Sequence, residues 1–401
     1  MSLNETVSAE RLHIGFFGMR NAGKSSVVNA VTGQDLAVVS DVKGTTTDPV
    51  KKAMELLPLG PVVIIDTPGL DDEGELGLLR VKKARRTLAQ TDIAILVVDA
   101  TVGLSELDQT LLQEFRDRNL PHVIVWNKAD LLTDRPSLDE HGIYVSAVTG
   151  ENIYALKERI GALKGQEVQK RVVADLLEPG DVVVLVVPID SAAPKGRLIL
   201  PQQLTIRDIL DAGCIPVVCR DTELVQTLGK LSAPPKLVIT DSQVFGKIKN
   251  LVPETIPLTS FSILMARYKG ELAIQVQGAA MLSRLKDGDK ILISEGCTHH
   301  RQCGDIGTEK MPKWIGDFSD ASITFDFTSG GTFPEDLSPY ALVVHCGGCM
   351  LNEKEMAHRI RTAEAAGVPM VNYGVAIARM NGILRRSLEI FPHVLSMLDD
   401  E

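Results

Sequence analysis

The sequence has few aromatic residues and no excess of basic ones. Phe, Trp and Tyr make up 4% of its 401 residues, which argues against the aromatic stacking platforms that bind single-stranded nucleic acid. Lys and Arg total 42 against 52 Asp and Glu, a formal charge of −10. The chain therefore lacks the broad basic face that binds a phosphate backbone, and we expect no nucleic-acid partner.

Long apolar runs are also missing. The longest, such as residues 182–187, are far shorter than the roughly 18 residues of a membrane-spanning helix. The first ten residues are polar and acidic, without the basic-then-apolar pattern of a signal peptide. We expect a cytoplasmic protein with no membrane partner, whose thiols stay reduced. Six cysteines in such a chain do not predict a disulfide scaffold, so their clustering matters more than their number.

The length suggests two to three domains at about 150 residues each. Val- and Ile-rich runs without alternation recur between stretches of helical length, which is typical of parallel sheets covered by helices on both faces. The expected strands are residues 13–17, 62–65, 93–98, 122–126, 143–145, 182–187, 215–219, 236–240, 290–294, 341–344 and 370–373. The expected helices include residues 78–91, 105–118, 205–212 and 221–231. A polar stretch at 165–171 is expected to be a linker, and we predict three α/β domains, over residues 1–168, 172–262 and 263–401.

The first domain contains a phosphate-binding pattern between a strand and a helix, the context that such a loop requires. Its glycines allow backbone N–H groups to surround phosphates, Lys24 places a charge at the β and γ phosphates, and the Ser25 hydroxyl binds Mg²⁺. The residues expected to contact the nucleotide here are Gly18, Asn21, Ala22, Gly23, Lys24, Ser25 and Ser26.

Three further motifs follow in order, each at the end of an expected strand. Asp66 is expected to reach the metal through water, and the Gly69 N–H to contact the γ-phosphate. In the segment Asn127-Lys128-Ala129-Asp130, the carboxylate can accept both donors of the guanine N1 and N2 edge, which adenine does not supply. Ser146-Ala147 would offer a backbone N–H to the guanine oxygen. The series predicts a P-loop GTPase domain that binds GTP and Mg²⁺.

The segment Gly44-Thr45-Thr46-Thr47-Asp48 is expected to be the switch that closes on Mg²⁺, with Thr46 joining Lys24, Asp66 and Gly69 in hydrolysis. With Asn21, it resembles the TrmE–Era type of tRNA-modifying and ribosome-assembly GTPases. That resemblance implies K⁺ binding and K⁺-stimulated hydrolysis, although Asn21 could equally be a turn residue. An apolar Leu70 stands where Ras-like enzymes place a water-orienting Gln, so slow hydrolysis is expected.

The last third of the chain carries a second group of chemically active residues. Cys297-Thr298-His299 and His345-Cys346-Gly347-Gly348-Cys349 each follow an expected strand, so in a parallel sheet both lie at the same edge. Thiolate-rich sets with C-x-x-C spacing suit an iron–sulfur cluster or zinc. Cys303 and His300 are expected to be loop residues, and Cys214 and Cys219 to be core.

The combination of Gly18–Ser25, Asp66–Gly69, Asn127–Asp130, Cys297-x-His299 and His345-Cys346-x-x-Cys349 resembles the family of [FeFe]-hydrogenase maturation GTPases, HydF, over the whole chain. The predicted fold has two smaller, Rossmann-like parallel-sheet domains after the GTPase domain, and the resemblance implies that one serves dimerisation and the other cluster binding. The resemblance also implies Cys297, Cys346 and Cys349 as ligands of a [4Fe–4S] cluster, with His299 and His345 as candidates for the fourth position or the second shell.

A scaffold and carrier role follows from the resemblance alone. It implies a homodimer that receives a di-iron precursor made with two radical-SAM maturases and delivers it to apo-[FeFe]-hydrogenase. Two alternatives stay open at this point: an RNA- or ribosome-directed GTPase whose Cys and His residues hold structural zinc, and a nucleotide-switched structural dimer without cargo.

Overall fold

The computed structural model describes residues 10–34, 49–57, 59–70, 74–164, 170–189, 198–269, 272–296, 305–348 and 350–398. The chain divides into two compact units, residues 1–168 and residues 169–401. Both are α/β structures built around largely parallel sheets, so the α/β fold class expected from the sequence is confirmed.

The first unit is built on one six-stranded sheet with the order β2-β3-β1-β4-β5-β6. Its strands are β1 (Leu12–Phe17), β2 (Val50–Leu56), β3 (Gly60–Asp66), β4 (Ile93–Asp99), β5 (His122–Asn127) and β6 (Gly142–Tyr144). All neighbours pair in parallel except β2, which runs antiparallel to β3 at the edge. The apolar pattern does not reveal β2, because most of its side chains are exposed.

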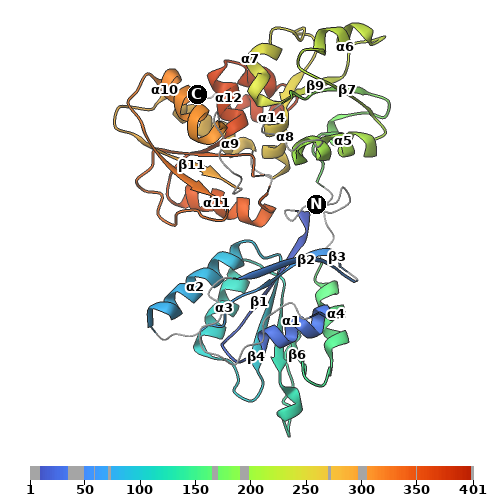
Figure 1. Cartoon of the computed structure of the whole chain (residues 1–401), viewed down its shortest axis with the longest axis vertical. Helices are drawn as coiled ribbons and strands as arrows, with labels where there is room; N and C mark the ends of the chain where they lie inside the picture. Colours follow the sequence, from blue (N-terminus) through green and yellow to red (C-terminus); the bar gives the residue numbers. More distant parts are fainter. Residues whose placement is uncertain are drawn as a thin grey trace. The chain divides into compact units, whose positions relative to one another are not determined.

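Helices cover both faces of this sheet. As Figure 1 shows, α1 (Lys24–Thr32) and α4 (Ile153–Ala162) lie together on one side, and α2 (Gly74–Ala89) and α3 (Glu106–Asp117) on the other. Two separate clusters of buried side chains match these two layers. The start of α3 is fixed by a capping box, in which the Ser105 hydroxyl accepts from the Asp108 N–H and the Asp108 carboxylate accepts from the Ser105 N–H.

The second unit contains two four-stranded parallel sheets with the orders β10-β9-β7-β8 and β12-β11-β13-β14. The strands are β7 (Val182–Val186), β8 (Ile215–Cys219), β9 (Leu237–Thr240), β10 (Leu258–Ser260), β11 (Lys290–Glu295), β12 (Thr324–Ser329), β13 (Leu342–His345) and β14 (Met370–Asn372). The sequence pattern misses β10, which has three residues, and β12, which has no fully buried side chain.

One continuous cluster of buried side chains joins the two sheets of this unit, from Val172 to Phe391. The helices around them are α5 (Leu200–Asp211), α6 (Leu224–Lys230), α7 (Phe245–Ile248), α8 (Phe261–Tyr268), α9 (Leu272–Ala280), α10 (Met311–Ser319), α11 (Glu353–Ala365), α12 (Tyr373–Met380), α13 (Leu384–Ser387) and α14 (Pro392–Ser396). The expected boundary between residues 262 and 263 falls inside α8, and the division into three domains stays a prediction. Within the described parts of the chain, no helix is both long and apolar enough to cross a bilayer.

A single carboxylate fixes the start of the second unit. Asp208 on α5 is 9% exposed, and its Oδ2 accepts the backbone N–H groups of Val172, Val173 and Ala174 at 2.9, 2.8 and 2.8 Å. These three donors are buried, so each needs an acceptor. Asp208 therefore connects the chain that enters this unit to the helix that covers its first sheet.

We predict that Asp208→Ala lowers the free energy of unfolding of the second unit by roughly 3–5 kcal/mol, because three buried donors lose their acceptor. Trp314 lies in this unit and Trp126 in the other, so urea unfolding followed by Trp314 fluorescence in a Trp126→Phe background isolates the effect. Asp211→Ala is the control, since Asp211 is an exposed residue of the same helix paired with Arg207 and should change stability by less than about 0.5 kcal/mol. An equal decrease in the free energy of unfolding in Asp208→Ala and Asp211→Ala would contradict the prediction.

Candidate functional site

The loop between β1 and α1 is shaped by glycine. Gly23, with φ of 81°, precedes the first residue of α1, and a Cβ there would lie 2.2 Å from Asn127 Nδ2. At Gly18, with φ of 142°, a Cβ would lie 2.1 Å from the Val97 carbonyl oxygen. A side chain at either position would displace the loop, so the glycines let the backbone close tightly around a phosphate.

Below this loop the structure brings together Lys24, Ser25 and Asp66. The Ser25 hydroxyl donates to Asp66 Oδ2 at 2.8 Å, and Lys24 Nζ lies 4.0 Å from Asp66 Oδ1. Burial lowers the pKa of Lys24, while the Asp66 charge opposes the shift. Burial raises the pKa of Asp66 against the opposing effects of Lys24 and the Ser25 hydrogen bond.

Asp66 Oδ1 is buried, and no described residue hydrogen-bonds to it. An unsatisfied carboxylate oxygen beside a serine hydroxyl is the oxygen-rich surrounding that Mg²⁺ prefers. The residues present therefore fit a magnesium ion bound together with a nucleotide phosphate.

The segment after Asp66 pairs with the phosphate loop. The Leu70 N–H donates to the Gly18 carbonyl at 3.2 Å, and the Arg20 N–H donates to the Leu70 carbonyl at 3.1 Å. A Cβ at Gly69 would lie 2.8 Å from Arg20 Cα, so the close approach requires glycine. The Leu70 side chain is fully buried in the core beneath α2 and α3 and presents no polar group to a water molecule. Thr46 and the rest of the expected switch lie outside the described residues.

The expected base-recognition residues meet at the ends of β5 and β6. Asn127 is buried, donates from Nδ2 to the Ala22 carbonyl at 3.0 Å and accepts at Oδ1 from the Ala147 N–H at 3.1 Å. It thereby joins the phosphate loop to the Ser146-Ala147 loop. Asp130, three residues after Asn127, is exposed, so its carboxylate is accessible to a base.

The backbone donors expected for the guanine oxygen already have acceptors in this structure. The Ser146 N–H donates to the Glu151 carbonyl at 3.2 Å, and the Ala147 N–H donates to Asn127 Oδ1. A guanine oxygen would have to share the Ala147 donor with Asn127. Asn21 adopts φ of 63°, the left-handed conformation that Asn tolerates best after Gly, so its backbone is that of a tight turn.

Two further residues support the base site, and the motifs do not reveal them. Asp99, at the end of β4, forms an ion pair with Lys128. Arg135 donates to the Ala129 carbonyl at 2.9 Å and pairs with Glu151, which connects the two base-recognition loops. The Val- and Ile-rich run before Asp99 predicts a strand end there, but no sequence signal identifies Arg135.

The second candidate site lies at the carboxyl edge of the sheet β12-β11-β13-β14. Strands β11 and β13 pair so that Ser294 is opposite His345, and the segments that follow the two strands leave the sheet side by side. Cys346 is half-buried. Its Sγ accepts the Gly296 N–H at 3.0 Å and the Gly348 N–H at 3.4 Å.

These two glycines directly precede Cys297 and Cys349 in the chain. Two backbone donors hold the Cys346 sulfur in place, and a cysteine thiolate is the form that binds a metal. Cys346 therefore fits a thiolate ligand, whether of an iron–sulfur cluster or of zinc. Cys297, His299, His300, Cys303 and Cys349 lie outside the described residues.

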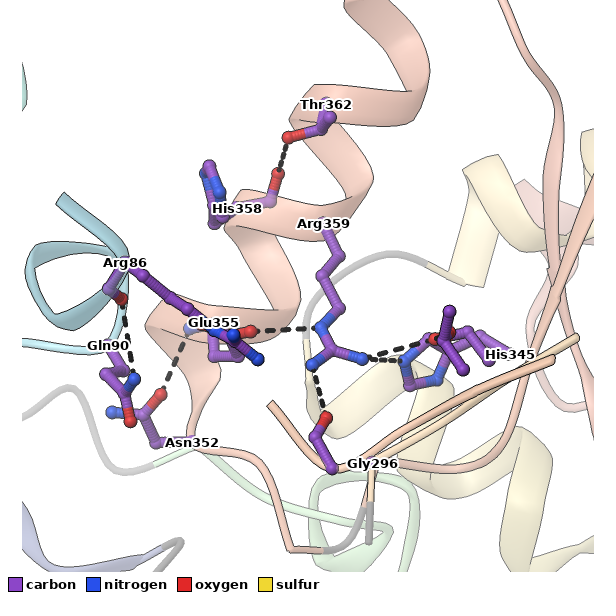
Figure 2. Close-up of polar contacts among 12 residues, drawn as sticks. Arg86, Gln90, Gly296, His345, Asn352, Glu355, His358, Arg359 and Thr362 are labelled. Atoms are coloured by element: carbon purple, nitrogen blue, oxygen red, sulfur yellow. Dashed lines mark hydrogen bonds and ion pairs between the residues drawn. The ribbon is translucent and has the colours of Figure 1, made fainter. Parts of the chain in front are cut away.

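His345, the last residue of β13, points into the protein and not into solvent. It is fully buried, with Nδ1 2.6 Å from the Cys346 carbonyl oxygen and Nε2 3.0 Å from an Arg359 guanidinium nitrogen. Figure 2 shows Glu355, Arg359 and His345 in a row, with Arg359 between the other two. Burial, with the nearby Arg359 charge, lowers the pKa of His345 to about 3, so the ring is neutral at physiological pH.

The remaining cysteines are part of the core. Cys214 and Cys219 are 4% and 8% exposed, which confirms the expectation from the sequence. Over the described ranges, which omit three of the four clustered cysteines, no group of three or more His, Cys, Asp or Glu side chains is arranged to hold a metal ion.

Three protein-family models match the chain in sequence order. Residues 13–128 match the 50S ribosome-binding GTPase model, residues 172–270 the hydrogen maturase F dimerization domain, and residues 273–390 the hydrogen maturase F tetramerization domain. The two hydrogen maturase F models together match more than half of the chain.

Individual relatives match the GTPase part. The tRNA modification GTPase MnmE of Nitrosomonas europaea is 35% identical over 156 residues, 37% of this chain and 34% of its own. GTPase Der of Kosmotoga olearia is 35% identical over 131 residues, 31% of this chain and 29% of its own. The chain thus spans about a third of the length of these curated relatives. The crystal structure of a single-residue variant of Aquifex aeolicus Era bound to GDP and AlF4⁻ is similar with a TM-score of 0.34 and 21% identity, and the match covers 52% of this chain and 92% of that one.

The family resemblance inferred from the motifs is confirmed by these matches, and the GTPase part is related to the TrmE-like enzymes, as expected. A GTPase domain followed by both hydrogen maturase F domains places the chain in the hydrogen maturase F family.

Proposed function

We propose that this chain is a GTP-hydrolysing scaffold that holds a [4Fe–4S] cluster and carries a di-iron precursor to apo-[FeFe]-hydrogenase. One observation carries the cluster part of the proposal: the residues directly before Cys297 and Cys349 both donate to Cys346 Sγ. The segments that lead into Cys297 and into Cys349 therefore both start beside the Cys346 sulfur. Three thiolates suit an iron–sulfur cluster with one exchangeable iron position.

In the proposed nucleotide site, each residue has a separate task. The backbone of Gly18–Gly23 and the Lys24 ammonium bind the phosphates, and Ser25 with Asp66 holds Mg²⁺. Asp130 selects guanine through two hydrogen bonds to its N1 and N2 donors. Hydrolysis is slow, because the buried Leu70 leaves the attacking water without a side chain to orient it. Asn21 would bind K⁺ and Thr46 would bind Mg²⁺, which would complete the site.

At the cysteine site, Cys297, Cys346 and Cys349 would hold the cluster, with His299 or His345 at the fourth iron or in the second shell. When bound, such a cluster supplies an iron atom with an open position to which cargo can attach. The chain's contribution is to keep the Cys346 sulfur oriented by two backbone donors and to leave this edge of the sheet accessible, since Cys346 is only half-buried.

The proposed partners are apo-[FeFe]-hydrogenase, two radical-SAM maturases and a second copy of this chain. Support for a homodimer comes from β8, which lies at the edge of its sheet. Its Ile215 and Val218 are 52% and 47% exposed, and Leu210 and Val225 on the flanking helices are exposed too. An apolar strand edge of this kind favours pairing with another chain.

We predict that Asp130→Asn weakens GTP binding about 100-fold, because it removes the acceptor of two charge-assisted hydrogen bonds. Xanthosine triphosphate should regain affinity, since its 2-oxo group can accept from the new amide. Lys24→Ala should lose binding of both nucleotides. Isothermal titration calorimetry checks these changes, with the exposed Asp117→Asn on α3 as control. GTP affinity in Asp130→Asn equal to that of the control would rule out the base assignment.

Hydrolysis should be faster in potassium than in sodium at equal ionic strength. We predict this because Asn21 can supply an amide oxygen beside the phosphates, where a monovalent cation would stabilise developing charge. Initial rates of phosphate release in the two chloride salts, for the wild type and Asn21→Ala, provide the measurement. Equal rates in the wild type would remove this role from Asn21.

The central test of the proposal measures the cysteine site and the nucleotide site independently in the same variants. Cys297→Ala, Cys346→Ala and Cys349→Ala should each lose the cluster after anaerobic reconstitution and fail to activate a hydrogenase. They should retain GTP hydrolysis, because the nucleotide site has its own core in a separate unit. Iron content, electron paramagnetic resonance of the reduced protein and the GTPase rate are measured together, with the buried Cys219→Ala as the matched control. A cluster that survives Cys346→Ala unaltered would refute the ligand assignment.

A further inference from the structure

A fully buried arginine lies beneath the cysteine site. Arg359, on α11, is 0% exposed, and its Nε donates to Glu355 Oε1 at 3.0 Å, one turn earlier on the same helix. A buried guanidinium requires both a counter-charge and acceptors for its remaining donors. Glu355 provides the counter-charge, and the remaining donors point toward the ends of the strands (Figure 2).

Those donors reach three neighbouring strands of one sheet. Arg359 contacts Ser294 Oγ on β11 at 3.3 Å, the carbonyl of Gly330 directly after β12 at 2.7 Å, and His345 Nε2 at the end of β13 at 3.0 Å. In the sheet these strands are adjacent, in the order β12-β11-β13. One side chain thus holds together the edge from which Gly296 and Cys346 leave the fold.

The contacts of His345 determine which of its nitrogens carries the proton. A guanidinium has no acceptor, so Nε2 facing Arg359 must be the unprotonated nitrogen. A carbonyl oxygen cannot donate, so Nδ1 facing Cys346 must carry the proton. Both contacts require the same neutral tautomer, in which each ring nitrogen has a partner within the protein. Binding iron through either nitrogen would break one of these two hydrogen bonds.

Resting on the proposed cluster function, we infer that His345 and Arg359 are positioning residues for the Cys346 ligand and that His345 is not itself an iron ligand. The His345 Nδ1–H holds the Cys346 carbonyl at 2.6 Å, which fixes the peptide orientation of this residue. The Cys346 N–H donates to the Ser294 carbonyl at 3.0 Å. With both sides of its backbone held, Cys346 presents its sulfur to the Gly296 and Gly348 donors in one orientation.

The test compares His345→Ala, Arg359→Lys and the double variant with the wild type after anaerobic reconstitution of the full chain with iron and sulfide. Arg359→Lys keeps the charge beside Glu355 but cannot make all the contacts of the guanidinium. Arg361→Lys, an exposed arginine on the same helix, is the matched control. Iron uptake, pulsed electron paramagnetic resonance of the reduced cluster and thermal unfolding of the iron-free chain are measured for each.

We expect both single variants to lose iron uptake several-fold, and the double variant to lose no more than either, because the two residues act as one unit. If the wild-type spectrum shows a histidine nitrogen bound to the cluster iron, that signal should remain in His345→Ala. The Arg361→Lys control should behave as the wild type. Two results would overturn this inference while leaving the proposed function intact. One is wild-type iron uptake in both single variants, and the other is loss of an iron-bound nitrogen signal in His345→Ala alone.

A second measurement does not depend on cluster formation or on the stability of the variants. In the iron-free chain labelled with ¹⁵N-histidine, nuclear magnetic resonance should show His345 as the neutral Nδ1–H tautomer. Finding the proton on Nε2 would overturn the inference. Wild-type protein that takes up no iron would instead overturn the proposed function, and this inference with it.

Discussion

Parallel pairing of strands is the constraint on which both candidate sites depend. Because parallel strands all end at the same edge, the loops after them meet even when they are distant in sequence. In the first unit this edge carries the phosphate loop, Asp66 and the base-recognition loops. In the second unit it joins Gly296 to Cys346, whose neighbours Ser294 and His345 are paired across β11 and β13.

The sequence predicts the parts of both sites that depend on local pattern. Val- and Ile-rich runs locate most of the strands, and the motifs that follow them locate Lys24, Asp66, Asn127 and Cys346. The antiparallel edge strand β2 escapes this reasoning because exposed strands need no apolar run. The positions of Thr46, Cys297, His299 and Cys349 stay predictions, since they lie outside the described residues.

The residues that sequence reasoning misses are charged groups with distant partners. Arg359 is 65 residues from Ser294 along the chain, and Arg135 holds a carbonyl through a contact that no motif contains. An arginine on a polar helix looks like a surface residue until the fold is known, because most arginines are exposed. The sequence offers His345 as one of two candidates for the fourth iron ligand, but both of its ring nitrogens already contact groups of the protein, the Cys346 carbonyl and Arg359.

A buried Arg–Glu pair adds little net stability, because removing both charges from water costs about as much as their attraction returns. The contacts of Arg359 therefore serve to fix the ends of β11, β12 and β13 relative to one another. In the proposed function the chain releases its cargo, so the part of the site that does not exchange has to keep its shape after the cargo has left. Backbone donors to Cys346 and a neutral, fully hydrogen-bonded His345 satisfy that requirement.

The most direct test of this account is Mössbauer spectroscopy of the wild-type chain reconstituted anaerobically with ⁵⁷Fe and sulfide, combined with metal analysis of the same sample. The account predicts about four iron atoms per chain in a [4Fe–4S] cluster, with one iron distinguishable from the others because its fourth ligand is not a cysteine. A colourless protein that holds one tightly bound zinc ion and takes up no iron would contradict it, since a closed zinc site serves structure and leaves no position for cargo.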